Sequence, residues 1–209
     1  MTLLYGLYAI TDPALCPDDR ILEQVQQALD GGVRLLQYRN KTASANHCQQ
    51  QATAILALCQ QANVPLLIND DVALAKQIGA DGVHIGQTDG AVANACTSLG
   101  EHAIIGVTCH DSIELALHAQ QQGASYVAFG RFFTSKTKPD ASPADASILT
   151  AAKQQLTIPV CAIGGITAEN GTSLLTAGAD MLAVINGVFA ATNVETAARQ
   201  YAQLFADNK

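Results

Sequence analysis

The chain has 209 residues, of which 49% are apolar and 14% are charged, so it can bury one large core or two small ones. Its formal net charge of −7 argues against a nucleic-acid or anionic-membrane surface but leaves room for a local basic pocket. No apolar run approaches the roughly 20 residues of a membrane span, and no signal peptide is evident, so we expect a cytoplasmic protein.

Short apolar runs alternate with helical patterns along the whole chain. The runs are apolar on both faces, which is typical of buried parallel strands. In chain order they cover residues 6–11, 35–39, 66–69, 82–85, 104–108, 126–129, 160–163 and 181–185. A helical segment follows each run. Several of these segments end at a glycine that would take the left-handed conformation closing a helix, namely Gly31, Gly79 and Gly123.

Eight strand–helix units predict an α/β fold, a (β/α)8 TIM barrel that forms a single domain over residues 1–209. The alternative is a doubly wound open sheet, which usually carries a glycine fingerprint after its first strand. Here the first strand ends in "AITDPAL", which contains no such loop. The longest irregular stretch, residues 130–143, is a candidate active-site loop.

Barrels of this kind carry their chemistry where the strands end, at the face called the mouth below. Arg39, Lys41 and Lys138 fall there and would give an acidic protein a locally positive site, as a phosphorylated substrate requires. Asp70 and Asp89 follow two consecutive strands. Because Mg²⁺ is typically held by one or two carboxylates plus substrate phosphates, the two aspartates predict a magnesium site.

Other residues near the strand ends have structural interpretations. Asp71 is expected to cap a helix, and Asp81 and Asp180 to serve turns. His84 lies within a strand and is expected to be structural. His110 fits either an acid–base group or the start of a helix.

Two glycine-containing pairs also have two interpretations. Gly164–Gly165 and Asn186–Gly187 fit plain turns, or the phosphate cup that often follows strands seven and eight of a barrel. The six cysteines include no C-x-x-C pair, so neither a zinc ribbon nor a thioredoxin motif is supported. We expect them to be small buried apolar residues, with Cys109, beside a strand end, as the one to watch.

Seven motifs occur in one order over nearly the whole chain: "LYAITD", "GGVRLLQYRNK", "LLINDDVALAKQIGADGVHIGQTD", "GVTCH", "TSKTKPDASP", "AIGGIT" and "GADMLAVINGVF". With them the sequence resembles the thiamine-phosphate synthase family, also called thiamine-phosphate pyrophosphorylase. The resemblance implies a Mg²⁺-dependent transferase. Its reaction joins 4-amino-2-methyl-5-hydroxymethylpyrimidine pyrophosphate to 4-methyl-5-(2-phosphooxyethyl)thiazole and yields thiamine phosphate and pyrophosphate.

The resemblance also assigns roles to residues that match the motifs. It implies Asp70 and Asp89 as the magnesium pair, and Arg39, Lys41 and Lys138 as the groups that stabilise the leaving pyrophosphate. The pyrimidine-pyrophosphate contacts that it implies are Gln37, Arg39, Lys41, Asn69, Thr108 and Lys138. The thiazole-phosphate contacts that it implies are Ser135, Thr137, Gly165, Ile185 and Asn186.

Three of these positions depart from the common family pattern. Thr108 stands where many members have Ser, Ser135 where many have Thr, and Asn186 where Ser is common. The family chemistry is a dissociative substitution, in which pyrophosphate leaves a stabilised pyrimidine cation that the thiazole nitrogen attacks. Two other functions stay open: a thiazole tautomerase on the same fold, which needs no pyrophosphate site, and a non-catalytic phosphate-binding regulator. The expected partners are small molecules, and the oligomeric state is open, a homo-oligomer included.

Overall fold

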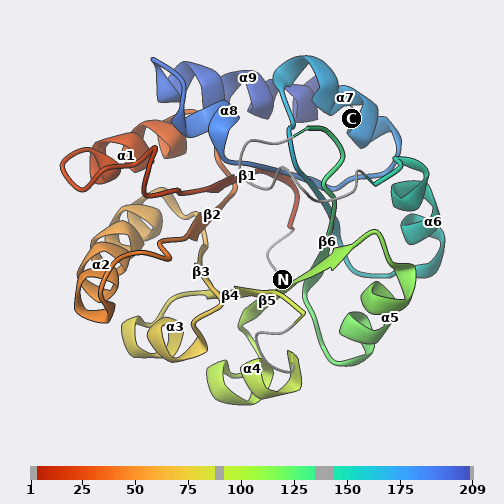
Figure 1. Cartoon of the computed structure of the whole chain (residues 1–209), viewed down its shortest axis with the longest axis horizontal. Helices are drawn as coiled ribbons and strands as arrows, with labels where there is room; N and C mark the ends of the chain where they lie inside the picture. The colour runs from red at the N-terminus through yellow and green to blue at the C-terminus, as the bar shows by residue number, and fades with distance from the viewer. Residues whose placement is uncertain (1–3, 88–91, 135–143, 208–209) are drawn as a thin grey trace.

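The computed structural model of the chain describes residues 4–87, 92–134 and 144–207. Eight parallel strands form a closed barrel in sequential order, and β8 pairs with β1. Figure 1 looks along the barrel and shows the helices as an outer ring around the strands. The predicted (β/α)8 TIM barrel is therefore confirmed, and the open sheet is excluded.

The strands are β1 (Gly6–Ile10), β2 (Leu35–Tyr38), β3 (Leu66–Asn69), β4 (Gly82–Ile85), β5 (Ile104–His110), β6 (Tyr126–Phe129), β7 (Val160–Ile163) and β8 (Met181–Val184). The helices are α1 (Ile21–Asp30), α2 (Ala45–Ala62), α3 (Val72–Ile78), α4 (Val92–Leu99), α5 (Ile113–Gln121), α6 (Ser147–Gln155), α7 (Ala168–Thr176), α8 (Asn186–Phe189) and α9 (Val194–Asp207).

The predicted strand bounds agree with the structure to within one residue, except in β5. There the pairing with β6 shifts between Thr108 and His110, and His110 takes the partner position opposite Phe129 with a φ of 54°. Residues other than glycine rarely adopt a left-handed backbone conformation. The pattern of apolar residues therefore gave no sign that the strand continues through His110. β5 therefore ends at His110, two residues later than predicted.

Two apolar layers stabilise the barrel. The larger lies between the outer face of the strands and the helices, and the smaller fills the barrel interior. The interior layer contains Leu4, Tyr8, Ile10, Leu35, Leu67, Tyr126, Ala128, Cys161, Met181 and Ala183. Because side chains alternate along a strand, β1, β2, β3, β6, β7 and β8 supply buried residues to both layers, which explains why these runs are apolar on both faces.

Gly106 of β5 makes room for a large ring inside the barrel. It pairs in register with Tyr126 of β6, and a Cβ at position 106 would lie 2.1 Å from Tyr126 Cζ. No carbon approaches another so closely without a bond, so any side chain here would displace the ring. The absence of a Cβ thus lets a fully buried tyrosine cross the interior beside β5.

The predicted structural aspartates behave as expected. Asp71 caps α3 by accepting a hydrogen bond from the Leu74 N–H at 2.8 Å. Asp81 and Asp180 each accept a backbone N–H at the start of a strand, from Leu66 and Val160, both at 2.8 Å. These carboxylates fix the strand starts, at the end of the barrel opposite the mouth.

The helices end at the predicted glycines: α1 stops at Asp30 with Gly31 as its C-cap, α3 at Ile78 before Gly79, and α5 just before Gly123. Gly79 closes α3 with φ 72°, and Gly123 has φ 97°. Gly31 is right-handed with φ −76°, and the left-handed residue is the next one, Gly32, with φ 97°. The predicted end of α1 is therefore confirmed, and only the left-handed conformation falls one residue later, because either glycine of the pair permits the turn.

The cysteines are free thiols, and four of them are buried: Cys16, Cys59, Cys109 and Cys161. Burial raises the pKa of the Cys109 thiol to about 12, so it is not a ready nucleophile at neutral pH. None of the described helices combines the length and the apolar character that crossing a bilayer would require.

Candidate active site

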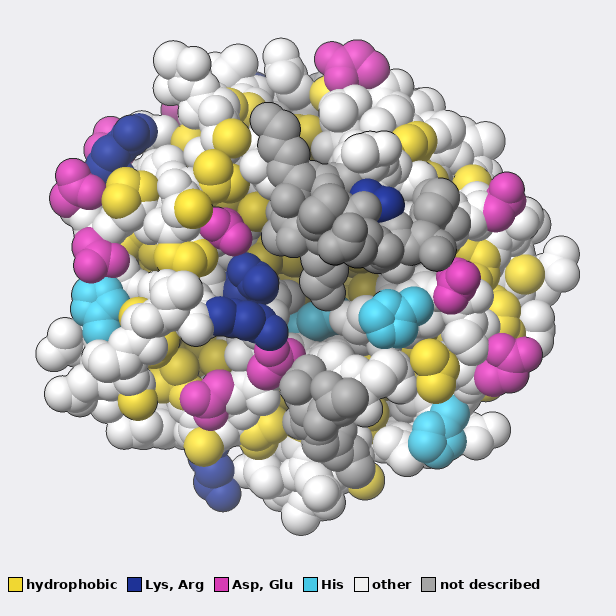
Figure 2. Space-filling model, in the orientation of Figure 1, with side chains coloured by type: hydrophobic (Ala, Val, Ile, Leu, Met, Phe, Trp, Pro, Cys, Tyr) yellow, Lys and Arg dark blue, Asp and Glu magenta, His cyan; other side chains and the backbone are white. Residues whose placement is uncertain are grey.

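Basic and acidic side chains meet at the mouth, where β2 and β3 end. Lys41 Nζ lies 2.9 Å from Asp70 Oδ2, and the Asn69 side-chain amide donates to the same oxygen at 2.6 Å. Figure 2 shows Lys and Arg side chains gathered with an acidic one beside the middle of this face. Lys41 keeps 57% of its side chain exposed and Asp70 keeps 27%, so both can still reach a ligand.

The backbone turns sharply at Asp70, which has φ 61°. Its N–H donates to the His84 carbonyl of β4 at 2.9 Å, and Asp71 begins the cap of α3 one residue later. An aspartate tolerates the left-handed conformation better than most residues do. The turn fixes the carboxylate of Asp70 at the mouth, whereas Asp71 serves the helix.

Arg39 is held by two residues at the end of β1. Its guanidinium lies 3.3 Å from Asp12 Oδ2, and its backbone N–H donates to Thr11 Oγ1 at 2.9 Å. The side chains of Arg39 and Asp12 are only 22% and 19% exposed. Sequence reasoning missed Asp12 and Thr11, although the "AITD" motif places both directly after the first strand.

Inside the barrel, five polar side chains from five strands form a continuous chain of hydrogen bonds. Gln37 Nε2 donates to the Tyr8 hydroxyl, and the Tyr126 hydroxyl donates to the Tyr8 hydroxyl at 2.9 Å. His84 Nδ1 lies 2.8 Å from the Tyr126 hydroxyl, and His84 Nε2 lies 2.9 Å from Thr108 Oγ1. We call this set the interior chain.

Gln37 and Thr108 were predicted as site residues, but Tyr8 and Tyr126 were not. Both tyrosines lie at inward-facing positions of their strands, and this alternation was the only available signal. Burial raises the pKa of both hydroxyls well above their ordinary value of 10.0, so each keeps its proton. The prediction that His84 is structural was incomplete, because its ring joins β5 to β6 within the interior chain.

The Gly164–Gly165 pair lies against the start of the loop that follows β6. Both glycines have positive φ, 106° and 66°, and the Phe133 N–H donates to the Gly164 carbonyl at 3.0 Å. A Cβ at Gly165 would lie 2.4 Å from the Thr134 carbonyl oxygen. The pair therefore permits a close backbone approach between two loops of the mouth, as well as a turn.

The end of β8 differs from a simple turn. Ile185 precedes the short helix α8, and Asn186 is its first residue. A Cβ at Gly187 would lie 2.0 Å from the Tyr201 hydroxyl, which donates to the Ile166 carbonyl at 3.0 Å. Gly187 is thus required for packing against α9, which supports its structural interpretation.

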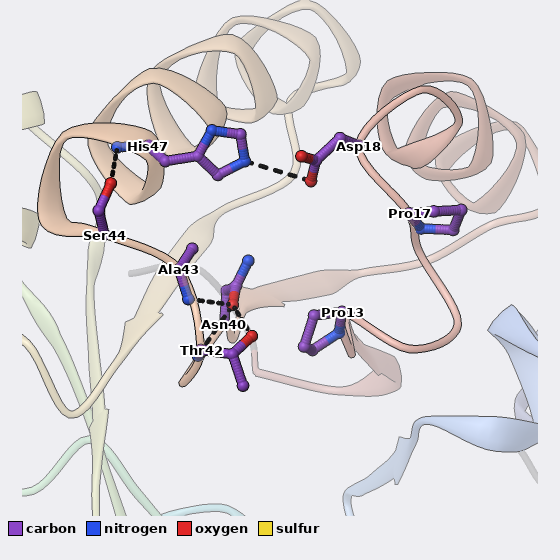
Figure 3. A pocket seen from close by; sticks show the side chains of 8 residues that line it. All are labelled: Pro13, Pro17, Asp18, Asn40, Thr42, Ala43, Ser44 and His47. Carbon is purple, nitrogen blue, oxygen red and sulfur yellow. Dashed lines mark hydrogen bonds and ion pairs between the residues drawn. The ribbon is translucent and has the colours of Figure 1, made fainter.

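An open pocket of about 630 Å³ lies beside this site, between the loops that follow β1 and β2 (Figure 3). Its polar groups already bind one another: Asn40 Oδ1 accepts the N–H groups of Thr42 and Ala43 at 3.1 Å, and His47 Nε2 lies 3.2 Å from Asp18 Oδ1. These contacts stabilise the loop that carries Lys41.

Several predicted site residues lie outside the described residues: Asp89, Ser135, Thr137 and Lys138. The described ranges hold the remaining ones, and they bring Gln37, Arg39, Lys41, Asn69, Asp70 and Thr108 to one side of the mouth and Gly165, Ile185 and Asn186 to the ends of β7 and β8. Within these ranges there is no group of three or more His, Cys, Asp or Glu side chains that could hold a metal.

Comparison with known proteins gives a consistent picture. A family described as thiamine monophosphate synthase matches residues 7–188. The thiamine-phosphate synthase of Saccharophagus degradans is 56% identical over 93% of this chain and 90% of its own length, and that of Alcanivorax borkumensis is 50% identical over 99% and 96%. The solved thiamine phosphate pyrophosphorylase of Pyrococcus furiosus superimposes with a TM-score of 0.90 at 30% identity, covering 99% of this chain and 98% of that one.

Proposed function

Because the chain belongs to the thiamine monophosphate synthase family, we propose that its mouth joins 4-amino-2-methyl-5-hydroxymethylpyrimidine pyrophosphate to 4-methyl-5-(2-phosphooxyethyl)thiazole. The products are thiamine phosphate and pyrophosphate. The observation that carries the assignment is the presence of Arg39, Lys41 and Asp70 where β2 and β3 end, with Arg39 held by Asp12 and Lys41 paired with Asp70.

Arg39 and Lys41 are the pyrophosphate-binding groups. Their positive charges lie where β2 ends, although the protein as a whole has a net charge of −7. Charge builds up on the pyrophosphate as its bond to the pyrimidine methylene breaks, so fixed cations there stabilise the transition state more than the ground state. From the family resemblance we assign the same role to Lys138.

We assign Mg²⁺ to Asp70 and Asp89. Asp70 fits the ion, because its carboxylate is partly exposed at the mouth and supplies hard oxygen atoms next to the proposed pyrophosphate groups. A site of one or two carboxylates completed by substrate phosphates does not require a cluster of three protein ligands. The ion, when bound, would neutralise charge on the pyrophosphate.

Gln37, Asn69 and Thr108 are the pyrimidine-binding groups. They come from β2, β3 and β5, and they are polar side chains next to an interior that is otherwise largely apolar. Such a site holds a ring by its faces and orients it by a few polar contacts at its edge. Asn69 also donates to Asp70, which links the ring site to the proposed metal site.

We assign the thiazole phosphate to the ends of β7 and β8. Gly165 permits a close backbone approach, and Ile185 and Asn186 begin a helical turn beside it. Ser135 and Thr137 are added from the family resemblance. Holding this phosphate would aim the thiazole nitrogen at the pyrimidine methylene, and the attacking nitrogen carries no proton, so the reaction needs positioning rather than a general base.

The decisive experiment is to incubate the protein with both substrates and Mg²⁺ and to measure thiamine phosphate and pyrophosphate. We expect equal amounts of the two products and none without Mg²⁺. A thiazole tautomerase would instead isomerise the thiazole precursor alone, and a phosphate-binding regulator would bind without turnover. Either result would replace the present assignment.

A further inference from the structure

A buried glutamine joins two loops of the mouth that are far apart in the sequence. Gln24 of α1 is 3% exposed, and its Nε2 donates to the Leu15 carbonyl at 3.2 Å and to the Phe189 carbonyl at 3.4 Å. Leu15 lies in the loop between β1 and α1, and Phe189 is the last residue of α8. Because β1 and β8 are paired neighbours, Gln24 bridges the place where the first and last strands close the barrel.

The direction of both hydrogen bonds follows from the partners. A backbone carbonyl can only accept, so the end of the Gln24 amide that faces Leu15 and Phe189 must be its NH2 group. The two carbonyls use the two hydrogens of that group. Among the described residues nothing donates to Gln24 Oε1, although this oxygen is buried. An unpaired buried oxygen is unfavourable, so Gln24 stabilises the fold less than its two hydrogen bonds alone would.

The Leu15 end of the bridge belongs to the segment that holds Arg39. The Asp12 carbonyl accepts the N–H groups of Leu15 and Cys16 at 3.0 and 2.8 Å, so residues 12–16 form one tight turn. The carboxylate of Asp12 is also the partner of the Arg39 guanidinium. Holding the Leu15 carbonyl therefore restricts where Asp12, and through it Arg39, can lie.

The Phe189 end of the bridge belongs to the turn that we assign to the thiazole phosphate. α8 is a single helical turn, and the Phe189 N–H donates to the Ile185 carbonyl at 3.0 Å. Ile185 and Asn186 begin this turn. Holding the Phe189 carbonyl therefore restricts where both of these residues can lie.

We propose that Gln24 is a positioning residue that sets the spacing between the pyrophosphate-binding part of the mouth and the thiazole-phosphate-binding part. It acts through two backbone carbonyls. For the identity of the two substrates the inference rests on the proposed function. The reaction joins two separately anchored molecules, so an error in spacing keeps the thiazole nitrogen from the pyrimidine methylene without weakening either anchor.

Gln24→Met tests this role, because methionine has a similar length but no N–H group. We expect the single-turnover rate with both substrates and Mg²⁺ at saturation to fall at least about tenfold. Calorimetric titration with each substrate alone should give affinities close to those of the wild type. A wild-type rate would refute the proposal. A comparable loss of affinity for one substrate alone would also refute it, because Gln24 would then shape that site and not the spacing.

Gln120→Met is the matched control. Gln120 also bridges two segments, since its Oε1 accepts the N–H groups of Thr157 and Ile158 at 2.7 and 3.3 Å. These contacts lie just before β7, at the end of the barrel opposite the mouth. The variant should lower the free energy of unfolding without slowing the reaction. Equal slowing in the two variants would indicate general loosening and would contradict a positioning role.

Hydrogen exchange of the ligand-free proteins tests the bridge without turnover. In Gln24→Met the amides of residues 12–16 and 186–190 should exchange faster than in the wild type, and in Gln120→Met they should not. Unchanged exchange of either segment in Gln24→Met would refute the bridge.

If Gln24→Met does not fold, the same measurements are made on Gln24→Asn. Its amide is shorter by one bond of about 1.5 Å and cannot reach both carbonyls, so the same results are expected. Failure of the wild type to form thiamine phosphate would refute the proposed function. The exchange measurement would still decide whether Gln24 joins the two loops.

Discussion

Lys41 and Asp70 form an ion pair at the mouth, with Nζ 2.9 Å from Oδ2. The lysine therefore occupies an oxygen that we assign to Mg²⁺, and the two cations must share or exchange this carboxylate when substrate binds. Because the lysine is half exposed, water and salt screen the pair, and the competition should be modest.

Lys41→Met should bind free Mg²⁺ about threefold more tightly than the wild type, because one competing cation is gone. The same variant should turn over at least ~30-fold more slowly, since a charge that stabilises the leaving group is lost. Calorimetric titration of Mg²⁺ without substrate measures the first effect. Lys76→Met, which removes an exposed cation from the last turn of α3, is the control. Unaltered Mg²⁺ affinity in Lys41→Met would show that Lys41 and Mg²⁺ do not compete for the Asp70 carboxylate.

Asp12→Ala should raise KM for the pyrimidine pyrophosphate and lower kcat, together about tenfold, because Arg39 loses the partner that orients its guanidinium. Asp12 uses one carboxylate oxygen for Arg39 and the other for the Ala14 N–H, and Asp12→Asn keeps a single acceptor oxygen in place of these two, so it should be milder than Asp12→Ala. Steady-state kinetics of both variants decide the point. Equal losses would mean that the charge of Asp12 matters more than the orientation it provides.

Gly165→Ala should weaken thiazole-phosphate binding at least about tenfold and leave pyrimidine-pyrophosphate binding nearly unchanged. Its Cβ would meet the Thr134 carbonyl at 2.4 Å and push the two loops apart. Gly79→Ala is a matched control, because Gly79 has a similar φ of 72° but no atom within 4 Å of the added Cβ. Gly79→Ala should lose about 1 kcal/mol of stability from backbone strain alone, Gly165→Ala should lose more because of the added clash, and only Gly165→Ala should lose affinity. Calorimetric titrations with each substrate distinguish the two.

Lys138→Ala should lower kcat more than it raises KM, by about 30- to 1,000-fold, if its charge stabilises the leaving pyrophosphate in the transition state. Lys136→Ala provides a neighbouring lysine as the reference and should have a smaller effect. Single-turnover quench-flow isolates the chemical step. If both variants slow that step equally, the segment acts through its total charge and not through one lysine.

Stability should fall as the pH rises above about 9. Burial raises the pKa of Cys109 from 9.0 to about 12, so the unfolded chain releases this proton first and is favoured between these two values. Each such thiol contributes a loss of about 1.4 kcal/mol per pH unit within that window. Urea unfolding from pH 8 to 10.5 should show a shallower decline in Cys109→Ala than in the wild type. Val107→Ala shortens another buried side chain of β5 without removing a thiol, and it should keep the wild-type slope.

The strands were predictable because a barrel strand packs against helices on one side and against the interior on the other. Residues 66–68 and 126–129 are accordingly apolar throughout, and the predicted bounds, 66–69 and 126–129, match β3 and β6. The extension of β5 to His110 was not predictable, since it depends on a shift in register against β6. Local patterns carry no information about such a shift.

The candidate site also has a part that the sequence predicts and a part that it does not. Arg39, Lys41 and Asp70 follow strands directly, so the rule that chemistry lies at strand ends brings them to one mouth. The contact between Tyr8 and Tyr126 spans 118 residues of sequence and depends on the diameter of the closed barrel. A single sequence gives an inward direction for each ring but does not say that two hydroxyls meet, so the interior chain needed the three-dimensional structure.

The fit between Gly106 and Tyr126 constrains how this barrel can evolve. A mutation that gives residue 106 a side chain is tolerated only after the tyrosine has become smaller, and a smaller residue 126 breaks the route from Tyr8 to His84. The two positions are therefore epistatic, and no order of single substitutions exchanges them without an intermediate that has lost either the packing or the hydrogen bonds. Descendants that replace this interior must pass through such an intermediate or compensate at a third strand, which makes the pair a durable mark of common ancestry.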